Sequence, residues 1–272
     1  INMLYKNFNC ARIDSRQVKS GDLFIALRGN TQDGHDFVLD AVKNGATQLI
    51  LAQKFKSKFK SQLDSKPIIV HWVADPNQEL VNVAKQIREH NLDKVIAITG
   101  SAGKTTVRYW LEHVLERSGL GVGNVLTNPK NYNTHTGLPL TIFNCETNQH
   151  TAVLEMGARN IGDIQYLVDI AQPNIALVNN VQTAHIEVFG SRDNIAQAKF
   201  EIFNNLQPQP ESNNIAVINQ DDDYAASYQL DLNKKNFGFW DLYRKFCLKK
   251  NKEESKKCQE LYRNLFQNKI NN

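Results

Sequence analysis

Short apolar runs alternate with segments of helical periodicity between residues 95 and 220. The apolar runs occupy residues 95–99, 151–157, 174–180 and 214–220, and they are apolar throughout rather than at every second position. Strands of this kind are typical of a parallel sheet that helices cover on both faces. The pattern therefore predicts an α/β fold with a mostly parallel sheet.

Three helices are expected between these strands. They are predicted from Lys104 to about Ser118, over residues 161–171, and around Ile195 to Leu206. Each would carry the chain from the end of one strand to the start of another, which parallel pairing requires.

A smaller α/β unit is predicted nearer the N-terminus. Residues 22–27, 47–52 and 67–72 have the composition of strands, and residues 36–46 have the spacing of a helix. A lysine-rich loop is expected before the third of these strands. The unit has too few strands to be the main domain, so we expect a small separate domain.

A polar break at residues 91–94 separates the two patterns. Before it, Asp75 and Pro76 have the types expected for the N-cap and first residue of a helix that ends near His90. We expect an N-terminal domain over residues 1–90, a central domain over residues 91–228 and a basic tail over residues 229–272. The tail shows no strand pattern, so it is expected either to form one or two amphipathic helices or to be solvated and poorly ordered.

The distribution of charge argues against a folded nucleic-acid-binding face. The chain has 32 Lys and Arg and 28 Asp and Glu, a formal net charge of +4. Residues 234–272 alone carry a net charge of +7, which leaves −3 for the first 233 residues. Nucleic-acid binding through the tail is therefore kept only as a minor alternative.

The composition favours a cytoplasmic protein. No apolar run approaches the roughly 18 to 20 residues that cross a bilayer, and the first ten residues lack the apolar region of a signal peptide. Cysteines occur only at positions 10, 145, 247 and 258, with no CxxC pair. This spacing is typical of reduced thiols rather than of a zinc knuckle or a disulfide framework.

The segment TGSAGKTT at residues 99–106 has the composition of a phosphate-binding loop. It follows a predicted strand and opens a predicted helix, so backbone N–H groups and the helix N-terminus would face phosphate oxygens. It departs from the pattern GxxxxGK[ST], because Ile98 stands where the first glycine would be. A structural glycine turn is the alternative. The expected mononucleotide site comprises Gly100, Ser101, Ala102, Gly103, Lys104, Thr105 and Thr106.

Several further segments, together with this loop, resemble the Mur ligases in order and spacing. They are NPKNYNTHTGLPLTI at 128–142, LEMGA at 154–158, NNVQTAHIEVFGS at 179–191 and AQAKFEIF at 196–203. Residues 14–37, DSRQVKSGDLFIALRGNTQDGHDF, resemble the N-terminal domain of the family member that adds D-alanyl-D-alanine. The resemblance covers roughly residues 12 to 224.

The resemblance implies a three-domain, ATP-dependent amide ligase of cytoplasmic peptidoglycan synthesis, acting as a monomer. Its substrates would be UDP-N-acetylmuramoyl-tripeptide and D-alanyl-D-alanine, with ATP and Mg²⁺ as cofactors. The substrate carboxylate would attack the γ-phosphate, and the incoming amine would open the resulting acyl phosphate. Positioned cations would supply most of the catalysis, because phosphoryl transfer spreads negative charge over several oxygens.

The resemblance also gives roles to residues of the central domain. Lys104 and the N–H groups of residues 101–105 would hold the β- and γ-phosphates, and the Thr105 hydroxyl would ligate Mg²⁺. Glu155 ends a predicted strand, where ligands collect in open α/β sheets, and a carboxylate there suits Mg²⁺. A surface carboxylate at a strand end is the alternative reading of Glu155.

Two further residues complete the catalytic and metal-binding set of Lys104, Thr105 and Glu155. By resemblance, His185 helps to hold a second metal ion. Lys199 would be carbamylated, which turns an ammonium group into a carboxylate-like metal ligand. The alternatives are a solvated loop histidine and a solvated lysine on a helix surface.

The same comparison of motifs gives the expected substrate-binding residues. Those at the UDP end are Asp14, Ser15, Arg16, Asp33, Gly34 and His35, although such residues also occur simply in turns. The guanidinium of Arg16 suits a diphosphate or a supporting carboxylate. The expected lining of the muramoyl-peptide cleft comprises Thr127, Asn128, Asn131 and Asn133.

The chain departs from the family in two ways. Thr134 stands where a second asparagine is usual, and Thr136 where an apolar residue is usual. The chain is also much shorter than similar ligases, and residues 229–272 resemble nothing in the family. We therefore expect the central domain to be truncated and the amine-binding domain to be missing. On that basis we expect little or no ligase activity from this chain. The alternatives to this active ligase are an inactive remnant that retains nucleotide or UDP-sugar binding and a related ligase, either another muramoyl-peptide synthetase or an enzyme of folylpolyglutamate type.

Overall fold

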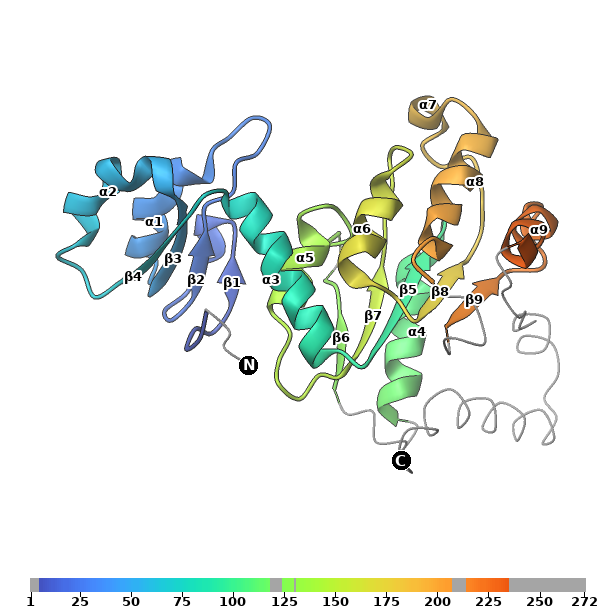
Figure 1. The fold of residues 1–272 in the computed structure, drawn as a ribbon, viewed down its shortest axis with the longest axis horizontal. Coiled ribbons are helices and arrows are strands. Elements are labelled where there is room, and N and C mark those ends of the chain that lie inside the picture. Colours follow the sequence, from blue (N-terminus) through green and yellow to red (C-terminus); the bar gives the residue numbers. More distant parts are fainter. Residues whose placement is uncertain (1–4, 118–123, 130, 207–213, 235–272) are drawn as a thin grey trace. The chain divides into compact units, whose positions relative to one another are not determined.

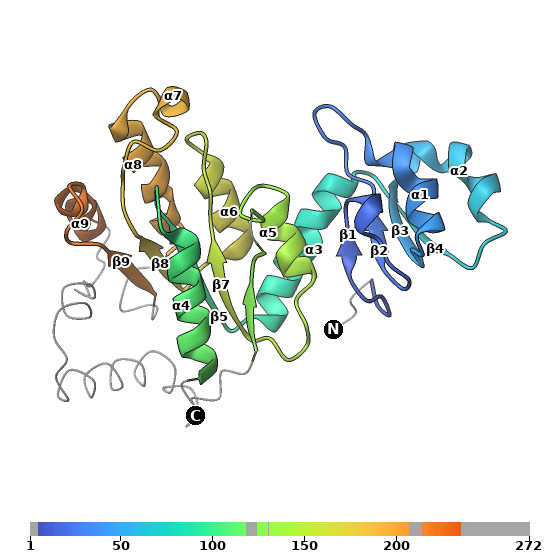
Figure 2. The same cartoon turned by 180° about the vertical axis from the view of Figure 1, so that it is seen from behind.

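The computed structural model describes residues 5–117, 124–129, 131–206 and 214–234. They form two compact units, each built on its own parallel sheet (Figures 1 and 2). The first unit contains residues up to 90 together with 139–146. The second contains residues 91–138 and the described residues from 147 onward. The expected α/β fold with mostly parallel sheets is confirmed.

The first unit has a four-stranded sheet in which every described pairing is parallel. The order is β1-β2-β3-β4, so each strand is the neighbour of the one before it in sequence. The strands are β1 (Ala11–Arg12), β2 (Leu23–Ile25), β3 (Gln48–Ala52) and β4 (Ile69–Val73). Because the strands run in one direction, the loops that follow them gather at one edge of the sheet.

Helices connect these strands. They are α1 (Val38–Lys43), α2 (Lys56–Leu63) and α3 (Pro76–Asn91), with short 3-10 turns η1 (Ser15–Gln17), η2 (Gly34–Phe37) and η3 (Gln53–Phe55). The side chain of Asp75 accepts the N–H of Asn77 at 2.8 Å at the start of α3, as its sequence predicts. The expectation of a lysine-rich loop before β4 is wrong in part. Helix α2 lies within this segment and buries Phe59 and Leu63.

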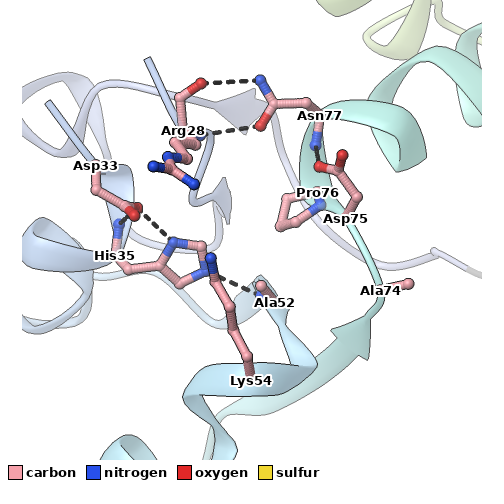
Figure 3. Close-up of a pocket in the computed structure, with 9 residues that line it drawn as sticks. All are labelled: Arg28, Asp33, His35, Ala52, Lys54, Ala74, Asp75, Pro76 and Asn77. Atoms are coloured by element: carbon pink, nitrogen blue, oxygen red, sulfur yellow. Dashed lines mark hydrogen bonds and ion pairs between the residues drawn. The ribbon is translucent and has the colours of Figure 1, made fainter. Parts of the chain in front are cut away.

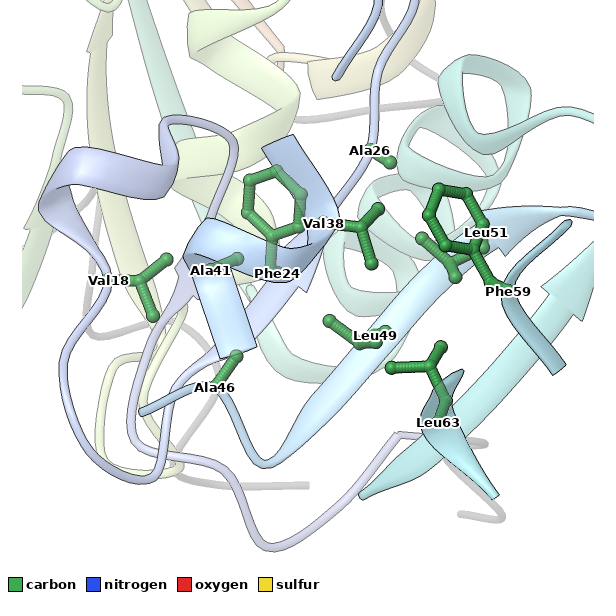
Figure 4. Packing of buried hydrophobic residues seen from close by; sticks show 10 residues of the cluster. All are labelled: Val18, Phe24, Ala26, Val38, Ala41, Ala46, Leu49, Leu51, Phe59 and Leu63. Carbon is green, nitrogen blue, oxygen red and sulfur yellow. The ribbon is translucent and has the colours of Figure 1, made fainter. Parts of the chain in front are cut away.

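The core of the first unit lies between the sheet and its helices (Figure 4). Phe24 of β2 and Leu49 and Leu51 of β3 are fully buried. They pack with Phe59 and Leu63 of α2. The other residues of this helix are lysine, serine and glutamine. The remaining members of this cluster are Val18, Ala26, Val38, Ala41 and Ala46.

The second unit has a five-stranded sheet in the order β6-β7-β5-β8-β9, with all described pairings parallel. The strands are β5 (Lys94–Thr99), β6 (Val125–Thr127), β7 (Thr151–Glu155), β8 (Ile175–Val178) and β9 (Ile215–Ile218). Four of them lie where the apolar runs predict them. The short edge strand β6 was not expected, because three residues show no clear pattern.

Helices cover both faces of this sheet, as Figures 1 and 2 show from opposite sides. One face packs against α4 (Lys104–Arg117), through a core cluster that includes Ile98 and Val153. The other face carries α6 (Asp163–Ala171) and α8 (Arg192–Phe200), and η4 (Glu201–Phe203) follows α8. The three expected helices are therefore present, the last as an α-helix continued by a 3-10 turn.

The remaining helices are α5 (Gly137–Phe143), α7 (Ile186–Phe189) and α9 (Ala225–Lys234). The last of these runs through residues 228 and 229, where the sequence suggested a domain boundary. The rest of the expected tail, residues 235–272, lies outside the described residues. No helix among the described residues has the length and hydrophobicity needed to cross a membrane.

Candidate active site

The phosphate-binding loop lies at a change of direction in the topology of the second sheet. Strand β5 is central, and the chain that leaves it passes through α4 to β6 and β7 on one side. After β7 the chain crosses to β8 and β9 on the other side. In open α/β sheets, the crevice at the carboxyl ends of the strands at such a switch point is where ligands bind. The loop after β5, residues 100–103, and the loop after β8 therefore meet at a favourable place for a ligand.

Two asparagines that directly follow β8 hold the phosphate-binding loop. Asn179 donates through Nδ2 to the carbonyl of Ala102 at 2.8 Å, and Asn180 donates to the same carbonyl at 3.1 Å. A Cβ on Gly103, where φ is +76°, would lie 2.9 Å from Nδ2 of Asn179. Another residue would be strained by this positive φ and would displace the Asn179 amide from the loop. Sequence reasoning missed both asparagines as loop supports, although their place after an apolar strand puts them at the same sheet edge.

The N–H groups of the loop are only partly free for phosphate. The N–H of Ser101 donates to the Asn180 carbonyl at 3.0 Å, and the N–H of Ala102 donates to Oδ1 of Asn180 at 2.9 Å. These two N–H groups are engaged by Asn180 in this structure, and the binding of phosphate by the N–H groups of residues 101–105 stays a prediction. The N–H groups in the first turn of α4 have no carbonyl from a preceding turn to bond, so they remain suited to an anion.

Lys104 begins α4 and reaches back across the loop. Its Nζ donates to the carbonyl of Gly100 at 2.8 Å. Burial lowers the pKa of Lys104, and the negative charge of Glu155 acts in the opposite direction. The ammonium group is thus held at the loop, beside a carboxylate.

The carboxylate of Glu155 links two segments at this edge. Its Oε2 accepts the Thr105 hydroxyl at 2.7 Å, and its Oε1 accepts Nδ2 of Asn133 at 2.7 Å. Only 3% of Glu155 is exposed. The structure therefore brings together Thr105, Glu155 and Asn133, all three of which are expected site residues.

Asn128 supports the backbone of Glu155. Its Oδ1 accepts the Glu155 N–H at 2.9 Å, and its Nδ2 donates to the Glu155 carbonyl at 2.9 Å and to the Tyr132 carbonyl at 3.1 Å. The residue is 1% exposed. Its amide group is engaged and buried in this structure, so a substrate contact of Asn128 stays a prediction.

The other expected cleft residues lie nearby with different partners. Thr127 donates through its hydroxyl to Glu112 at 3.3 Å. Asn131 is exposed, with a positive φ of +70°. Thr134, which replaces the asparagine usual in the family, accepts the N–H of Gly137 through its hydroxyl at 3.4 Å, at the start of α5.

Lys199 is buried on α8 and not solvated on the helix surface. Only 5% of the residue is exposed. Burial lowers the pKa of Lys199 to about 8, and the positive charge of Lys104 acts in the same direction. Two lysines therefore influence each other at this site, and at a given pH a larger fraction of Lys199 is neutral than of an ordinary lysine.

His185 has no described contact with Glu155, Lys104 or Lys199. It lies in the turn before α7 with φ +61°, its side chain is 58% exposed, and its Nδ1 is 3.9 Å from Glu187. Among the residues that the structure describes, no three His, Cys, Asp or Glu side chains are grouped to hold a metal ion. A role for His185 in metal binding therefore stays a prediction.

The first unit has a cavity of about 390 Å³ at the carboxyl edge of its sheet (Figure 3). Its lining includes the basic side chains Arg28 and Lys54. Asn77 binds the backbone of Arg28 twice. Its Oδ1 accepts the Arg28 N–H at 2.9 Å, and its Nδ2 donates to the Arg28 carbonyl at 3.1 Å. The complete lining is Arg28, Asp33, His35, Ala52, Lys54, Ala74, Asp75, Pro76 and Asn77. Of these, sequence reasoning found only Asp33 and His35.

His35 is fixed in one tautomer by its partners. Its Nε2 accepts the N–H of Ala52 at 2.9 Å, so the proton of the neutral ring is on Nδ1, which lies 2.6 Å from Oδ1 of Asp33. Burial raises the pKa of Asp33, but hydrogen bonds from the backbone and ring of His35, with the charge of Lys54, together lower it. His35 is 3% exposed and both ring nitrogens are engaged in this structure, so its direct contact with substrate stays a prediction.

The remaining residues expected at the UDP end form local structure. Asp14 binds Arg16 in a forked ion pair, with distances of 2.9 Å to Nε and 2.7 Å to Nη2, and this bond lowers the pKa of Asp14. Ser15 is buried, and its carbonyl accepts Nδ2 of Asn44. A Cβ on Gly34 would lie 2.8 Å from the backbone N and O of Leu27, so only glycine fits there.

Comparison with known proteins decides the family. The family model of the Mur ligase middle domain matches residues 98–268, and that of the Mur ligase family catalytic domain matches residues 7–99. The chain belongs to the Mur ligase family. The match to the middle domain runs beyond residue 224, so the expectation that residues 229–272 are unlike the family is not supported by it.

Relatives and solved structures agree with this assignment. The UDP-N-acetylmuramoyl-tripeptide--D-alanyl-D-alanine ligase of Rickettsia prowazekii is 38% identical over 78% of this chain and 44% of the relative. That of Escherichia coli is 35% identical over 79% of this chain and 44% of the relative. A crystal structure of MurF from Acinetobacter baumannii is similar with a TM-score of 0.69 and 34% identity, over 84% of this chain and 46% of that one.

A structure of MurF ligase from Thermotoga maritima in complex with ADP has a TM-score of 0.62 and 32% identity to this chain. The match covers 84% of this chain and 48% of that one. This chain thus spans somewhat less than half the length of the relatives that it matches.

Proposed function

We propose that this chain supplies the UDP-sugar-binding and ATP-binding parts of a ligase that adds D-alanyl-D-alanine to UDP-N-acetylmuramoyl-tripeptide. The observation that carries the proposal is the cluster of Lys104, Thr105 and Glu155 at the switch point of the second sheet. Two relatives named for that reaction are 35% and 38% identical to this chain. The reaction would serve peptidoglycan synthesis.

The second unit would bind the phosphates of ATP. The first turn of α4 offers N–H groups and the positive end of a helix dipole, and Lys104 adds a full positive charge. The hydrogen bond from Lys104 to the Gly100 carbonyl would be exchanged for one to phosphate. The ADP complex named for the Thermotoga maritima relative supports a nucleotide at this fold.

The donor atoms beside the loop fit Mg²⁺. The Thr105 hydroxyl and the Glu155 carboxylate are hard oxygen donors 2.7 Å apart, and nucleotide phosphates would complete the set. Mg²⁺ at this place would neutralise the charge of the β- and γ-phosphates. Asn133 would orient the carboxylate through its bond to Oε1.

The chemistry would then proceed in two balanced steps. A substrate carboxylate oxygen forms a bond to the γ-phosphorus while the bond to the bridging oxygen breaks, which gives an acyl phosphate and ADP. The amine of D-alanyl-D-alanine next attacks the acyl carbon, loses a proton and displaces phosphate. Lys104 would stabilise the negative charge that spreads over the γ-phosphate oxygens during the first step.

Lys199 would react with carbon dioxide to form a carbamate. Its neutral amine forms an N–C bond to CO₂, the π electrons of one C=O bond move to oxygen, and the amine loses a proton to water. The support is its burial and a pKa lowered to about 8, which makes the neutral, nucleophilic form of the amine more abundant than in an ordinary lysine. The product is an anion, which removes the repulsion between the ammonium groups of Lys199 and Lys104.

The first unit would bind the UDP end of the substrate. Arg28 and Lys54 at its cavity offer two positive charges to a diphosphate. The wall of this cavity would be shaped by Asp33, Gly34 and His35. The side chain of Arg16 is 87% exposed, so it would be available at the surface. Ser15 would contribute through backbone groups.

A second candidate function is binding without ligation. The chain spans 44% of the length of the Rickettsia and Escherichia ligases. The described residues offer a phosphate-binding loop with Lys104 and a cavity lined by Arg28 and Lys54, and these would hold a nucleotide or UDP-sugar without amine transfer. The two functions differ in phosphate release.

The test is phosphate release by the purified chain with MgATP, UDP-N-acetylmuramoyl-tripeptide and D-alanyl-D-alanine, with a parallel calorimetric titration of MgADP. The ligase reading expects release that requires all three substrates and disappears in Lys104→Ala. The matched control is Lys85→Ala, an exposed lysine on α3. Nucleotide binding without release would favour the second candidate, and neither binding nor release would contradict both.

A further inference from the structure

The buried carboxylate of Glu201 binds the start of a distant helix. Its Oε1 accepts the N–H of Gly162 at 2.6 Å and its Oε2 accepts the N–H of Gln165 at 3.0 Å. The residue is 8% exposed. Both oxygens are therefore occupied by backbone groups at the N-terminus of α6, where the helix dipole also favours a negative charge.

This contact fixes the loop that begins at the active site. Residues 156–162 join Glu155, at the end of β7, to α6. Within the loop, Oδ2 of Asp163 accepts the N–H groups of Arg159 and Asn160 at 2.8 and 2.9 Å. The carboxylate of Asp163 thus closes the loop on itself, and the carboxylate of Glu201 holds its far end.

Glu201 also belongs to the segment that carries Lys199. It stands two residues after Lys199, where α8 ends and η4 begins. Its carboxylate therefore links the C-terminal end of α8 to the loop that follows Glu155. Displacing this end of α8 would move the buried amine of Lys199 relative to that loop.

A second group of polar contacts joins the same two segments further along α6. Nδ2 of Asn205 donates to Oδ1 of Asp169 at 2.8 Å, and Nδ2 of Asn204 donates to Oε1 of Gln165 at 2.6 Å. These contacts stabilise the packing of η4 and α6 at a site further from Lys199 in the chain. They provide a matched comparison for Glu201.

We propose that Glu201 is a positioning residue, which holds the end of α8 against the start of α6 and so places the Lys199 amine where it can form and keep a carbamate. The proposal rests on the proposed function, because it takes the modification of Lys199 from there. A glutamine at 201 would retain one acceptor oxygen, but its amide N–H₂ would face a backbone N–H group and could not accept it.

The test compares Glu201→Gln with Asp169→Asn in the full chain. Each variant is equilibrated with ¹³C-bicarbonate, the carbamate carbon is observed by NMR, and the signal is assigned to Lys199 by its loss in Lys199→Met. Thermal unfolding and amide hydrogen exchange at residues 162 and 165 are measured in parallel. We expect Glu201→Gln to reduce the carbamate signal at least fivefold and to speed exchange at these amides, and Glu201→Asp to restore part of the signal.

The control separates positioning from stability. Asp169→Asn is expected to lower the melting temperature while leaving the carbamate signal unchanged. If Glu201→Gln keeps the full signal, or if Asp169→Asn loses as much signal for an equal loss of stability, the inference is overturned. If the unchanged chain forms no carbamate at Lys199, the modification in the proposed function fails instead.

Discussion

The hydroxyl of Thr105 donates to the carboxylate of Glu155 at 2.7 Å, across fifty residues of the chain. The contact joins the first turn of α4 to the end of β7 on the same face of the sheet. Asn133 binds the other oxygen of this carboxylate. A carboxylate held in this way has one orientation, so the Mg²⁺ site that we propose there would need little reorganisation when the cation binds.

Asn133→Ala should therefore weaken Mg²⁺ binding without removing a ligand. Partners that orient a metal ligand typically change metal affinity roughly 10- to 100-fold when lost, and we expect a decrease in this range. The measurement is the affinity of the chain for ADP, by calorimetry, at a series of Mg²⁺ concentrations. Gln197→Ala, an exposed residue on α8, is the control. Equal Mg²⁺ dependence in Asn133→Ala and the unchanged chain would contradict this role.

Asn128→Ala should lower the free energy of unfolding. The change leaves the N–H and C=O groups of Glu155 without their side-chain partner in a buried site, and each such group costs about 1–3 kcal/mol. We expect a total loss of about 2–4 kcal/mol in urea unfolding. Asn131→Gly, at an exposed position with positive φ, should change stability by less than about 0.5 kcal/mol. A loss no larger than in the control would show that water replaces the amide group.

The strands of the second sheet could be predicted because they are apolar throughout. Strand β6 could not, since its pairing with β7 rather than its sequence makes it a strand. Helix α2 was missed for a related reason. Phe59 and Leu63 are its two buried residues, and they become a core face only when they pack on Leu49 and Leu51.

The candidate site was predictable to the extent that strand ends indicate it. Glu155 and the loop at residues 99–106 follow apolar strands, so their shared edge follows from the parallel sheet. The part played by Asn128 depends on β6 lying beside β7, which the sequence does not reveal. For His35, the motif indicated a special residue, but only the acceptor contact with Ala52 shows that it acts within the protein.

The tautomer of His35 is open to direct measurement. ¹⁵N NMR at pH 7 should show an unprotonated Nε2 and a protonated Nδ1, because Nε2 accepts the N–H of Ala52. His35→Phe should lower the free energy of unfolding by about 1–3 kcal/mol, since it leaves that buried N–H without an acceptor. His90→Phe changes an exposed histidine and should have little effect. A proton on Nε2 would rule out the assigned hydrogen bond.

Lys199 should make the stability of the protein depend on pH in an unusual direction. Its pKa is about 8 in the folded state and 10.5 by its ordinary value, so the unfolded chain binds more protons between these limits. Stability should therefore rise as the pH increases from 8 to 10.5 in CO₂-free buffer. Below pH 8 the folded state carries the full penalty of the buried charge, on the order of 3 kcal/mol.

Lys199→Met isolates this contribution, because other titrating groups are common to both proteins. The variant should be more stable than the unchanged chain at pH 7, by up to about 3 kcal/mol, and this advantage should shrink progressively toward pH 10.5. Urea unfolding at pH 7, 8.5 and 10 would measure the difference, and Lys85→Met, which changes an exposed lysine, should show no such trend. A stability difference that is constant across this range would mean that the pKa of Lys199 is the same in the folded and the unfolded protein, so burial would not make its amine readier to react.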